Sequence, residues 1–476
     1  MNNDQRQNRQ TKVICTIGPA CRSPSMLEEL IRAGMDVARL HFSYGAHSEH
    51  AETIRHIREL SKRLGRYVAI LQDLSGSKAR MIGIVEERVR LEAGARFTLK
   101  ADKVEGDSAA VSISVPELVS VVTAGDTVLL ADGELELRAT AVTDSEIRCE
   151  VIRGGSVKSQ QGVHVPGKSA PVRVPTEKDR EDVRFGIQHG VDWIAMSYGT
   201  TGGEVHELRE FIRRNGADTP VVAKIERAQA LKDLESIIHA ADAVMVARGD
   251  LGMEISLEEI AWLQKDIIHR ANVAGKPVIT ATEMLTSMME QPRPTRAEVT
   301  DITNAILDGS DAVMLSGESA IGKYPLEAVT TMRDVALAAD HRIEPARTGY
   351  RSAADSEDEQ GMAVAQGACQ AALAFRASLI LCCTRAGRMA RLISQERPGI
   401  PVAGVSSSES TLRRMALFRG VEPVQMPATN DSAKATVNAA KQAVVESGLA
   451  QRGERVIVVT QEETDSASHS IRAEVL

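Results

Sequence analysis

Aromatic residues are scarce in this chain of 476 residues, where Phe, Tyr and Trp together make up 3% although hydrophobic residues reach 43%. The core must therefore be built from Val, Ile, Leu, Met and Ala. Such a composition is typical of parallel β-sheets buried on both faces, whose strands are continuous aliphatic runs. The length suggests about three domains.

Paired cysteines, long apolar runs and an excess of positive charge are also missing. The six cysteines include no Cys-x-x-Cys pair, which indicates reduced thiols rather than a disulfide or metal framework. No apolar run approaches the roughly 18 residues that span a bilayer, and the polar first ten residues show no secretory signal. The net charge of -8 argues against a nucleic-acid binder. We therefore expect a cytoplasmic protein that binds neither nucleic acid nor membrane.

Eight short aliphatic runs alternate with helical patterns, which predicts an α/β fold, the TIM (β/α)8 barrel with right-handed crossovers. The expected strands are Lys12–Ile17, Asp36–Leu40, Tyr67–Gln72, Asp192–Ser197, Val221–Ile225, Ala243–Ala247, Pro277–Ala281 and Asp311–Leu315. The helical patterns include Met26–Ala33, Glu49–Leu64 and Leu257–Val273. A further helix is expected at Thr176, which forms a capping-box pattern with Asp179.

The alternation is interrupted between Gly83 and Val165, where β-rich segments and Gly or Asp turns occur without a long helical pattern. This insertion follows the third barrel strand. Because the loops after barrel strands emerge at the mouth, it is expected to form a small β-barrel lid there.

A polar stretch rich in Ser, Asp and Glu from Arg342 to Gln360 indicates a linker, after which alternation resumes and predicts an open α/β domain with a mainly parallel sheet. Its expected elements are helices Gly361–Phe375 and Met389–Gln395 and strands Ser378–Cys383, Pro401–Val405, Val424–Met426 and Arg455–Thr460. The expected limits are 1–82 and 168–341 for the two parts of the barrel, 83–167 for the lid and 342–476 for the C-terminal domain.

Charged and hydroxyl side chains follow the aliphatic runs at the same end, where a barrel carries its active site. They are Arg39, His41 and Ser43 after the second run, Asp73 after the third, Lys224 and Glu226 after the fifth, Arg248, Gly249 and Asp250 after the sixth, Thr282 and Glu283 after the seventh, and Ser316 and Glu318 after the eighth. Any one of them could simply end a strand, but the repetition favours a functional site.

The carboxylates Glu226 and Asp250 close adjacent strands and form a hard oxygen site suited to Mg²⁺, with Mn²⁺ as an alternative. The competing interpretation is that they pair with Arg227 and Arg248. Lys224 and Arg39 would bring positive charge to the same pocket, as phosphoryl transfer requires. The HExxH, GxSxG, GxxxxGK[ST] and GxGxxG motifs of other enzyme classes are missing.

Several long segments resemble the pyruvate kinase family in order along nearly the whole chain. They are TKVICTIGPA, AGMDVARLHFSYG, VAKIERA, VMVARGDLGMEI, NVAGKPVITATEML, PRPTRAEVTDITNAILDGSDAVMLSGESAIGKYP and the final SIRAEVL. The resemblance implies Mg²⁺-dependent phosphoryl transfer between phosphoenolpyruvate and ADP, giving pyruvate and ATP in glycolysis, by a cytoplasmic homotetramer.

The resemblance also implies a role for each site residue. Lys224 would stabilise the phosphoryl group in the transition state, Arg39 would contact it, and Glu226 and Asp250 would hold Mg²⁺. The backbone of Ala247, Arg248, Gly249 and Asp250 would bind the substrate carboxylate, Thr282 would lie where the enolate is protonated, and Arg80, with Pro19 and Tyr44, would face the nucleotide. The lid would close and exclude water.

The chain departs from the family pattern mainly on the nucleotide side. The family usually has Asn at His41, His at Tyr44, a Lys at Gln161 and Asn at His164; Arg227 and Glu283 are further departures. Two alternatives to an active pyruvate kinase therefore stay open. One is a weakly active paralogue with a regulatory or binding role, and the other is a different Mg²⁺-dependent barrel enzyme that handles pyruvate enolate.

Two further expectations come from the resemblance. Relatives that need K⁺ line its pocket with Asn, Ser, Asp and a Thr carbonyl, beside a turn that carries Glu. Here Ser43 and Asp73 remain, but His41, Leu74 and Lys78 replace the others, so the Lys78 ammonium is expected to make K⁺ unnecessary.

In the C-terminal domain, the loop Thr384, Arg385, Gly387 and Arg388 opens a helix and is expected to bind a phosphorylated effector. Ala386 and Met389 replace hydroxyls that grip fructose bisphosphate in relatives, which predicts weak binding of that sugar.

Overall fold

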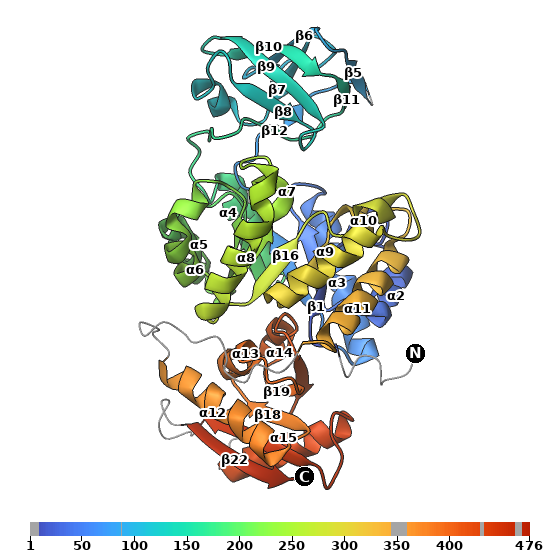
Figure 1. The fold of residues 1–476 in the computed structure, drawn as a ribbon, viewed down its shortest axis with the longest axis vertical. Coiled ribbons are helices and arrows are strands. Elements are labelled where there is room, and N and C mark those ends of the chain that lie inside the picture. The colour runs from blue at the N-terminus through green and yellow to red at the C-terminus, as the bar shows by residue number, and fades with distance from the viewer. Residues whose placement is uncertain (1–8, 87, 344–358, 429–432, 462–468) are drawn as a thin grey trace.

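The computed structural model describes residues 9–86, 88–343, 359–428, 433–461 and 469–476. Three domains follow one another along the long axis of the molecule (Figure 1). The inserted β domain lies at one end, the barrel in the middle and the C-terminal α/β domain at the other end. This arrangement places the two smaller domains at opposite mouths of the barrel.

The central domain is a closed barrel of eight parallel strands, as predicted. In chain order the strands are β1 (Lys12–Thr16), β2 (Val37–His41), β3 (Ala69–Asp73), β13 (Trp193–Met196), β14 (Val221–Ile225), β15 (Ala243–Ala247), β16 (Val278–Ala281) and β17 (Ala312–Leu315). Neighbours along the chain pair with each other, and β17 closes the ring by pairing with β1. Because both strand faces are buried, most strand residues are apolar, and nearly all are inaccessible to solvent.

Helices surround this barrel and connect its strands. They are α2 (Pro24–Ala33), α3 (His47–Leu64), α4 (Glu177–Gln188), α5 (Gly202–Arg214), η2 (Ala230–Asp233), α6 (Leu234–Ala240), α7 (Arg248–Leu251), α8 (Leu257–Val273), η3 (Thr286–Met289), α9 (Arg296–Asp308), α10 (Gly317–Ala320) and α11 (Pro325–Asp340). The capping box at Thr176 is confirmed, because its hydroxyl accepts from Asp179 N. Helix α2 begins two residues earlier than predicted, since Ser23 caps it and Pro24 fits its first turn.

The insertion is β-rich, as predicted. Its elements are β4 (Met81–Ile82), β5 (Val89–Leu91), β6 (Arg96–Lys100), β7 (Ala110–Ile113), η1 (Pro116–Ser120), β8 (Thr127–Leu130), β9 (Leu135–Val142), β10 (Glu146–Arg153), β11 (Gly155–Val157) and β12 (Val163–His164). Seven strands form a sheet in the order β12-β8-β9-β10-β6-β7-β4, and β11 pairs with β5. Alternate residues such as Phe97, Leu99, Val128 and Leu137 fill its core.

The C-terminal domain is an open α/β sheet. Its elements are α12 (Glu359–Phe375), β18 (Leu379–Cys383), α13 (Arg388–Gln395), β19 (Val402–Ser406), α14 (Glu409–Met415), β20 (Val421–Gln425), α15 (Ala433–Glu446), β21 (Arg455–Gln461) and β22 (His469–Val475). The sheet order is β20-β19-β18-β21-β22, and only the β21–β22 pairing is antiparallel.

Several details of this domain differ from the sequence predictions, which did not include helices α14 and α15. The strand expected at Val424–Met426 spans Val421–Gln425, because Val421 packs inside the domain and pairs with Val402. Strand β22 was not predicted, since half-exposed His469–Val475 lacks an aliphatic run. Most of the expected linker, 344–358, lies outside the described residues. Across the described ranges, the helices are all too short or too polar to cross a membrane.

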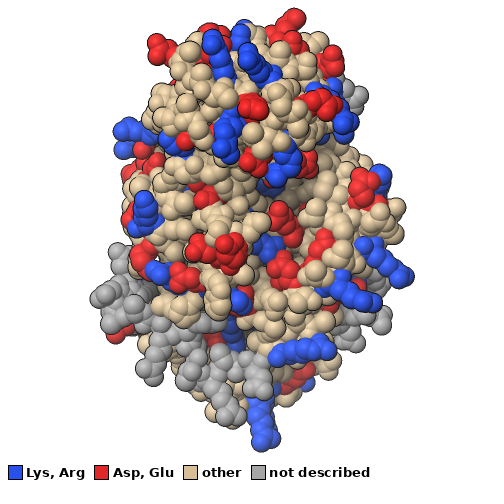
Figure 2. Space-filling view, turned by 45° about the horizontal axis from the view of Figure 1, so that its top comes forward, with Lys and Arg blue, Asp and Glu red and all other residues tan. Residues whose placement is uncertain are grey.

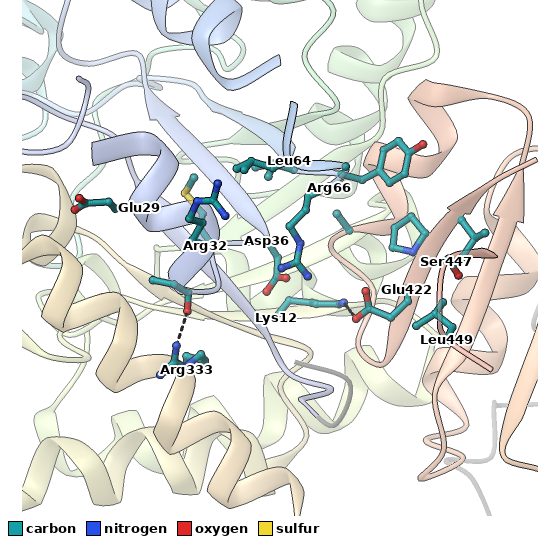
Figure 3. A pocket seen from close by; sticks show the side chains of 18 of the residues that line it. Lys12, Glu29, Arg32, Asp36, Leu64, Arg66, Arg333, Glu422, Ser447 and Leu449 are labelled. Atoms are coloured by element: carbon teal, nitrogen blue, oxygen red, sulfur yellow. Dashed lines mark hydrogen bonds and ion pairs between the residues drawn. The ribbon is translucent and has the colours of Figure 1, made fainter. Parts of the chain in front are cut away.

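The C-terminal domain contacts the barrel at the amino ends of its strands. Trp193 Nε1 at the start of β13 donates to Arg414 O (3.2 Å), and Arg413 pairs with Asp192 (2.8 Å). A cavity of about 750 Å³ lies between these domains (Figure 3), and Lys12 reaches Glu422 across it (3.5 Å). The carboxyl ends of the barrel strands therefore face the inserted domain.

Candidate active site

The carboxyl ends of the strands surround a small cavity of about 60 Å³ under the inserted domain. Figure 2 shows basic and acidic side chains interspersed on the molecular face around the hollow between the barrel and the inserted domain. The residues lining the cavity are Arg39, His41, Ser75, Lys78, Arg80, Ser197, Tyr198, Lys224, Glu226, Met245, Ala247, Asp250, Thr282 and Met314. Six of the thirteen residues expected from the strand ends therefore line one cavity, whereas Ser43, Asp73, Arg248, Gly249, Glu283, Ser316 and Glu318 do not line it.

Lys224 and Arg39 meet at the buried carboxylate of Asp73. Arg39 Nε donates to Asp73 Oδ2 (2.6 Å), and Lys224 Nζ donates to Asp73 Oδ1 (3.2 Å) and to Ser197 Oγ (2.8 Å). Burial alone would raise the pKa of Asp73, but Lys224 and Arg39 outweigh it and hold the pKa below its usual value. Two fixed cations thus line the cavity beside an ionised carboxylate.

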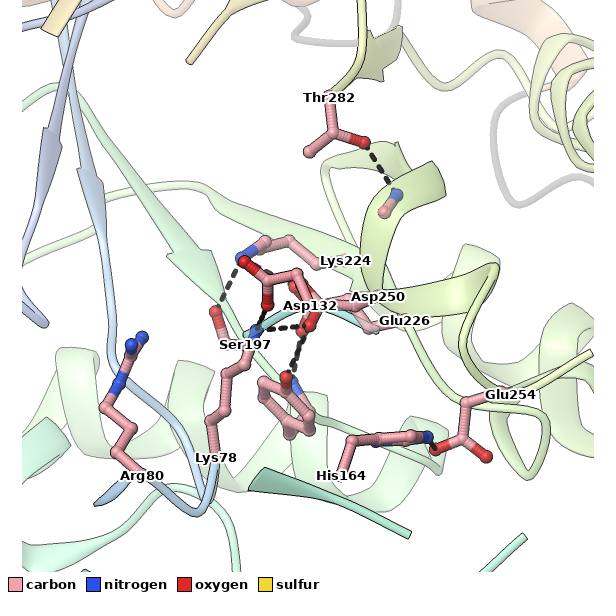
Figure 4. A network of polar contacts seen from close by, with 12 residues as sticks. Lys78, Arg80, Asp132, His164, Ser197, Lys224, Glu226, Asp250, Glu254 and Thr282 are labelled. Carbon is pink, nitrogen blue, oxygen red and sulfur yellow. Dashed lines mark hydrogen bonds and ion pairs between the residues drawn. The ribbon is translucent and has the colours of Figure 1, made fainter. Parts of the chain in front are cut away.

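Glu226 and Asp250 lie at the ends of neighbouring strands (Figure 4). Glu226 Oε1 forms an ion pair with Lys224 Nζ (2.7 Å), while Asp250 Oδ1 accepts from Lys78 Nζ (2.7 Å) and from Tyr198 Oη (2.7 Å). Burial raises the pKa of Glu226. Burial would also raise the pKa of Asp250, but Lys78 and Lys224 hold it below its usual value.

This oxygen set fits a divalent cation. Glu226 Oε1 is a buried oxygen whose one close partner among the described residues is the Lys224 ammonium, and Asp250 Oδ2 accepts no hydrogen bond from those residues. Mg²⁺ is commonly held by one or two carboxylates, with substrate and water in the other positions. No larger group of His, Cys, Asp or Glu in the described ranges is arranged to hold a metal by itself.

The two arginines next to these carboxylates have other partners. Arg227 donates to Glu254 (2.9 Å) and Ser169 (2.6 Å). Arg248 donates to Thr282 O (2.6 Å) and Asp301 (2.6 Å). Neither arginine therefore neutralises Glu226 or Asp250, and the side chain of Arg248 supports the loop after β16 rather than lining the cavity.

Thr282 lies on the opposite wall of the cavity, beside the first turn of α7. Its hydroxyl accepts from Gly249 N (2.7 Å) and donates to Ala281 O (2.6 Å). Both Thr282 (φ 66°) and Glu283 (φ 54°) have left-handed backbones. Such strained conformations persist where the surrounding structure fixes them, often at functional sites.

The models of two pyruvate kinase domains match the chain: the barrel domain over residues 8–329 and the alpha/beta domain over residues 362–471. The chain belongs to the pyruvate kinase family. Pyruvate kinases of Geobacillus stearothermophilus, Sporosarcina psychrophila and Staphylococcus aureus are 41%, 41% and 40% identical to it. These alignments cover 94%, 87% and 94% of this chain and 77%, 72% and 77% of the relatives. Membership makes the protein a phosphotransferase of glycolysis.

Of the residues expected at the nucleotide, Arg80 lines the cavity and Tyr44 contacts Arg80. Arg80 donates to Tyr44 Oη (3.0 Å) and to Gln160 O (2.8 Å), with its guanidinium 5.1 Å from the Tyr44 ring centre. Pro19 is exposed in the turn after β1. His164 is buried 3.7 Å from Glu254, and burial lowers its pKa to about 4. The positions that depart from the family pattern thus make contacts of their own.

The residues of the expected monovalent-cation pocket are only partly together. Asp73 is shared by Arg39 and Lys224, and Ser43 Oγ is buried with no hydrogen bond to any residue that the structure describes. The Lys78 ammonium contacts Asp250 and Asp132 (3.3 Å). Burial would lower the pKa of Lys78, but these two carboxylates raise it. The structure shows no contact between Lys78 and Ser43 or Asp73.

The expected effector loop follows β18 and opens α13. Gly387 (φ 81°) caps the helix and donates from its N–H to Thr384 Oγ1 (3.0 Å), while Arg385 O accepts from Thr411 (2.7 Å). Arg385 and Arg388 are exposed. The loop is thus held internally, with its basic side chains facing solvent.

Several residues of the site were missed in the sequence. Ser197 and Tyr198 follow β13 just as Lys224 and Glu226 end β14, so the strand-end pattern contained their signal. Thr16 ends β1 and accepts from Arg39 (2.8 Å). Asp132 offered no signal, because it reaches Lys78 from a turn of the inserted domain.

Proposed function

We propose that the protein transfers the phosphoryl group of phosphoenolpyruvate to ADP in an Mg²⁺-dependent reaction that gives pyruvate and ATP. The observation that carries this proposal is the convergence of Lys224 and Arg39 with the carboxylates Glu226 and Asp250 in one cavity. Phosphoryl transfer needs positive charge placed where the transferring oxygens develop charge, with little covalent help from the protein. The cavity provides that charge on rigid strand ends.

Glu226 and Asp250 would hold the metal ion, and Mn²⁺ would also suit these oxygens. Bound Mg²⁺ supplies a Lewis acid that neutralises phosphate and carboxylate oxygens. Lys224 and Arg39 bind the phosphoryl group, which they can do without rearranging because Asp73 and Ser197 fix their positions. The main-chain N–H groups of α7 bind the substrate carboxylate, and Thr282 lies at the face where the enolate is protonated.

Arg80, with Tyr44 and Pro19 nearby, is proposed to bind the nucleotide phosphates at the rim. The inserted domain would close over the site and exclude water, so that ADP accepts the phosphoryl group. The contact of Lys78 with both Asp132 of the inserted domain and Asp250 of the barrel supports this coupling of lid and site.

A coupled assay with phosphoenolpyruvate, ADP and Mg²⁺ tests the proposal. The native protein should produce pyruvate and ATP, and Glu226→Gln should lose most of this activity. Pyruvate formation at a rate no higher than that of Glu226→Gln would favour a weakly active paralogue. Enolate chemistry without ATP formation would favour another barrel enzyme.

We also propose that the enzyme needs no added K⁺, because fixed cations already surround its phosphoryl site. Asp73 is paired with both Arg39 and Lys224, and Lys78 adds a third positive charge at Asp250.

Effector binding is proposed at the loop Thr384–Arg388, whose exposed arginines and helix start suit a phosphate. Ala386 and Met389 offer it no hydroxyl, which supports weak affinity for fructose bisphosphate.

A cytoplasmic homotetramer is the proposed form of the enzyme. Leu257 and Trp262 on α8 are 76% and 72% exposed, and Ile321 after α10 is 61% exposed. Exposed large apolar side chains such as these are candidates for a subunit interface. Sedimentation velocity of the native protein and of Trp262→Glu should show a tetramer and a smaller species, respectively.

A further inference from the structure

Tyr198 occupies an unusual position next to the carboxylates of the site. It follows β13, is 7% exposed and has a left-handed backbone (φ 62°). A bulky residue in this conformation is rare and persists only where its surroundings fix it. The resulting turn directs both the main-chain N–H and the phenol of one residue toward the candidate metal ligands.

Each end of Tyr198 contacts a different carboxylate. Its N–H donates to Glu226 Oε2 (2.8 Å), and its hydroxyl donates to Asp250 Oδ1 (2.7 Å). Glu226 ends β14 and Asp250 follows β15, so one residue spans two neighbouring strand ends. These bonds occupy one oxygen of each carboxylate and fix the rotation of both groups.

The oxygens that Tyr198 does not contact are the ones available for a metal. Asp250 Oδ1 also accepts from Lys78, which leaves Oδ2 without a hydrogen bond from the described residues. Glu226 Oε1 is paired with Lys224 Nζ at 2.7 Å and has no other partner among the described residues. A neutral phenol can orient Asp250 in this way without adding a further positive charge that would compete with the cation.

The ring of Tyr198 is itself held in place. The guanidinium of Arg227 lies 5.2 Å from the ring centre, and Glu254 and Ser169 fix that guanidinium at 2.9 and 2.6 Å. Ser169 belongs to the segment that returns from the inserted domain after β12. The hydroxyl therefore has little freedom to leave Asp250.

We propose that Tyr198 is a positioning residue of the divalent-metal site, which aims Glu226 Oε1 and Asp250 Oδ2 at the ion by holding the opposite oxygens. This inference rests on the proposed function, in which those two carboxylates hold the metal. Groups that orient metal ligands typically contribute about 10- to 100-fold to metal affinity.

Mn²⁺ binding without substrates tests the inference directly, followed by the electron paramagnetic resonance signal of free Mn²⁺. Tyr198→Phe keeps the ring and the main-chain N–H and removes only the hydroxyl. We expect its Mn²⁺ dissociation constant to rise about tenfold. Tyr67→Phe is the matched control, since it removes a phenol that bonds to Gln425 (3.0 Å) at the domain interface, and it should bind Mn²⁺ as the native protein does.

Two additional variants separate this inference from the proposed function. If Glu226→Gln and Asp250→Asn bind Mn²⁺ as tightly as the native protein, the proposed metal site itself is wrong. If those two variants lose Mn²⁺ while Tyr198→Phe stays within twofold of the native affinity, only the positioning role is overturned. In the coupled assay with phosphoenolpyruvate and ADP, Tyr198→Phe should need about tenfold more Mg²⁺ for half-maximal rate and should approach the native kcat at saturating Mg²⁺. A lower kcat with an unchanged Mg²⁺ requirement would contradict the positioning role.

Discussion

Lys224 Nζ, on β14, lies 2.7 Å from Oε1 of Glu226, which directly follows that strand, so both side chains point into the barrel mouth. Burial would lower the pKa of Lys224, but Asp73 and Glu226 raise it, and the side chain stays an ammonium. A charge fixed in this way stabilises a transition state more than a substrate, because it need not reorganise as charge develops.

We predict that Lys224→Met lowers kcat by roughly 10²- to 10³-fold or more, as the removal of one preorganised donor does. Mn²⁺ and phosphoenolpyruvate binding should be largely retained, because Glu226 and Asp250 remain and Arg39 still pairs with Asp73. Steady-state kinetics measure the loss of turnover, and equilibrium binding measures the retained affinity for Mn²⁺ and phosphoenolpyruvate. Lys62→Met, on the exposed face of α3, is the control. Near-native turnover of Lys224→Met would refute the assigned role.

Activity without K⁺ is the second prediction. A second cation 4 Å from a fixed ammonium is repelled by about 4 kcal/mol at an effective dielectric constant of about 20. The protein should therefore show the same rate in tetramethylammonium buffer with and without KCl. Many-fold stimulation of the native protein by KCl would contradict this prediction.

The matching variant is Lys78→Glu, which should be less active without K⁺ and regain part of the loss when KCl is added. Because Lys78 pairs with Asp250 and Asp132, this change also places like charges together. Lys78→Gln separates the two effects, since it removes the ammonium without adding a carboxylate. A KCl response of Lys78→Glu that Lys78→Gln lacks would identify charge reversal as its cause.

The sequence predicted the barrel well because strands buried on both faces are continuous aliphatic runs. Strand β22 escaped prediction because it is a half-exposed edge strand, formed only by pairing with β21. The same limit applies within the site. Strand ends identified Lys224, Glu226 and Asp250, but no local pattern indicates that Arg248 turns to Asp301, 53 residues away.

The site contacts that were not predicted are contacts between segments that are distant in the sequence. Lys78 meets Asp132 because a turn of the inserted domain reaches the barrel mouth. Tyr198 reaches two carboxylates because its backbone is left-handed, which a sequence does not reveal for a tyrosine. Interactions between distant segments therefore decide the details of a site whose main residues are visible in the sequence.

The third prediction concerns the effector loop. Relatives that bind fructose bisphosphate tightly present hydroxyls where this chain has Ala386 and Met389, and each missing charge-assisted hydrogen bond is worth about 1.5–3 kcal/mol. Micromolar fructose bisphosphate should therefore leave the rate unchanged. Ala386→Ser, at an exposed position, should increase affinity in calorimetric titrations, whereas buried Met389 is unsuitable for such a change. Activation of the native protein at micromolar concentrations would count against this prediction.

The fourth prediction is a pH dependence of stability that originates at Glu396. This side chain is 6% exposed at the end of α13, where burial raises its pKa to about 7 and the Gln366 amide (3.4 Å) opposes the rise. An unfolded glutamate has a pKa of about 4.3. Between these values the folded protein keeps a proton that the unfolded chain has released, so the free energy of unfolding falls as the pH rises. The contribution is fully present below the unfolded pKa and is lost as the pH rises through 7.

Glu396→Gln should remove this dependence, because its amide resembles the protonated carboxyl and never ionises. We expect similar urea midpoints for the variant and the native protein at pH 4, below the unfolded pKa. At pH 8 the variant should be more stable by about 2 kcal/mol, after allowance for partial solvent screening. Glu150→Gln, at an exposed position on β10, is the control and should leave the native profile unchanged. If the native protein is as stable as Glu396→Gln at pH 8, the prediction is wrong. That result would mean that the Glu396 carboxyl ionises at its ordinary pKa, since its charge would then not destabilise the fold.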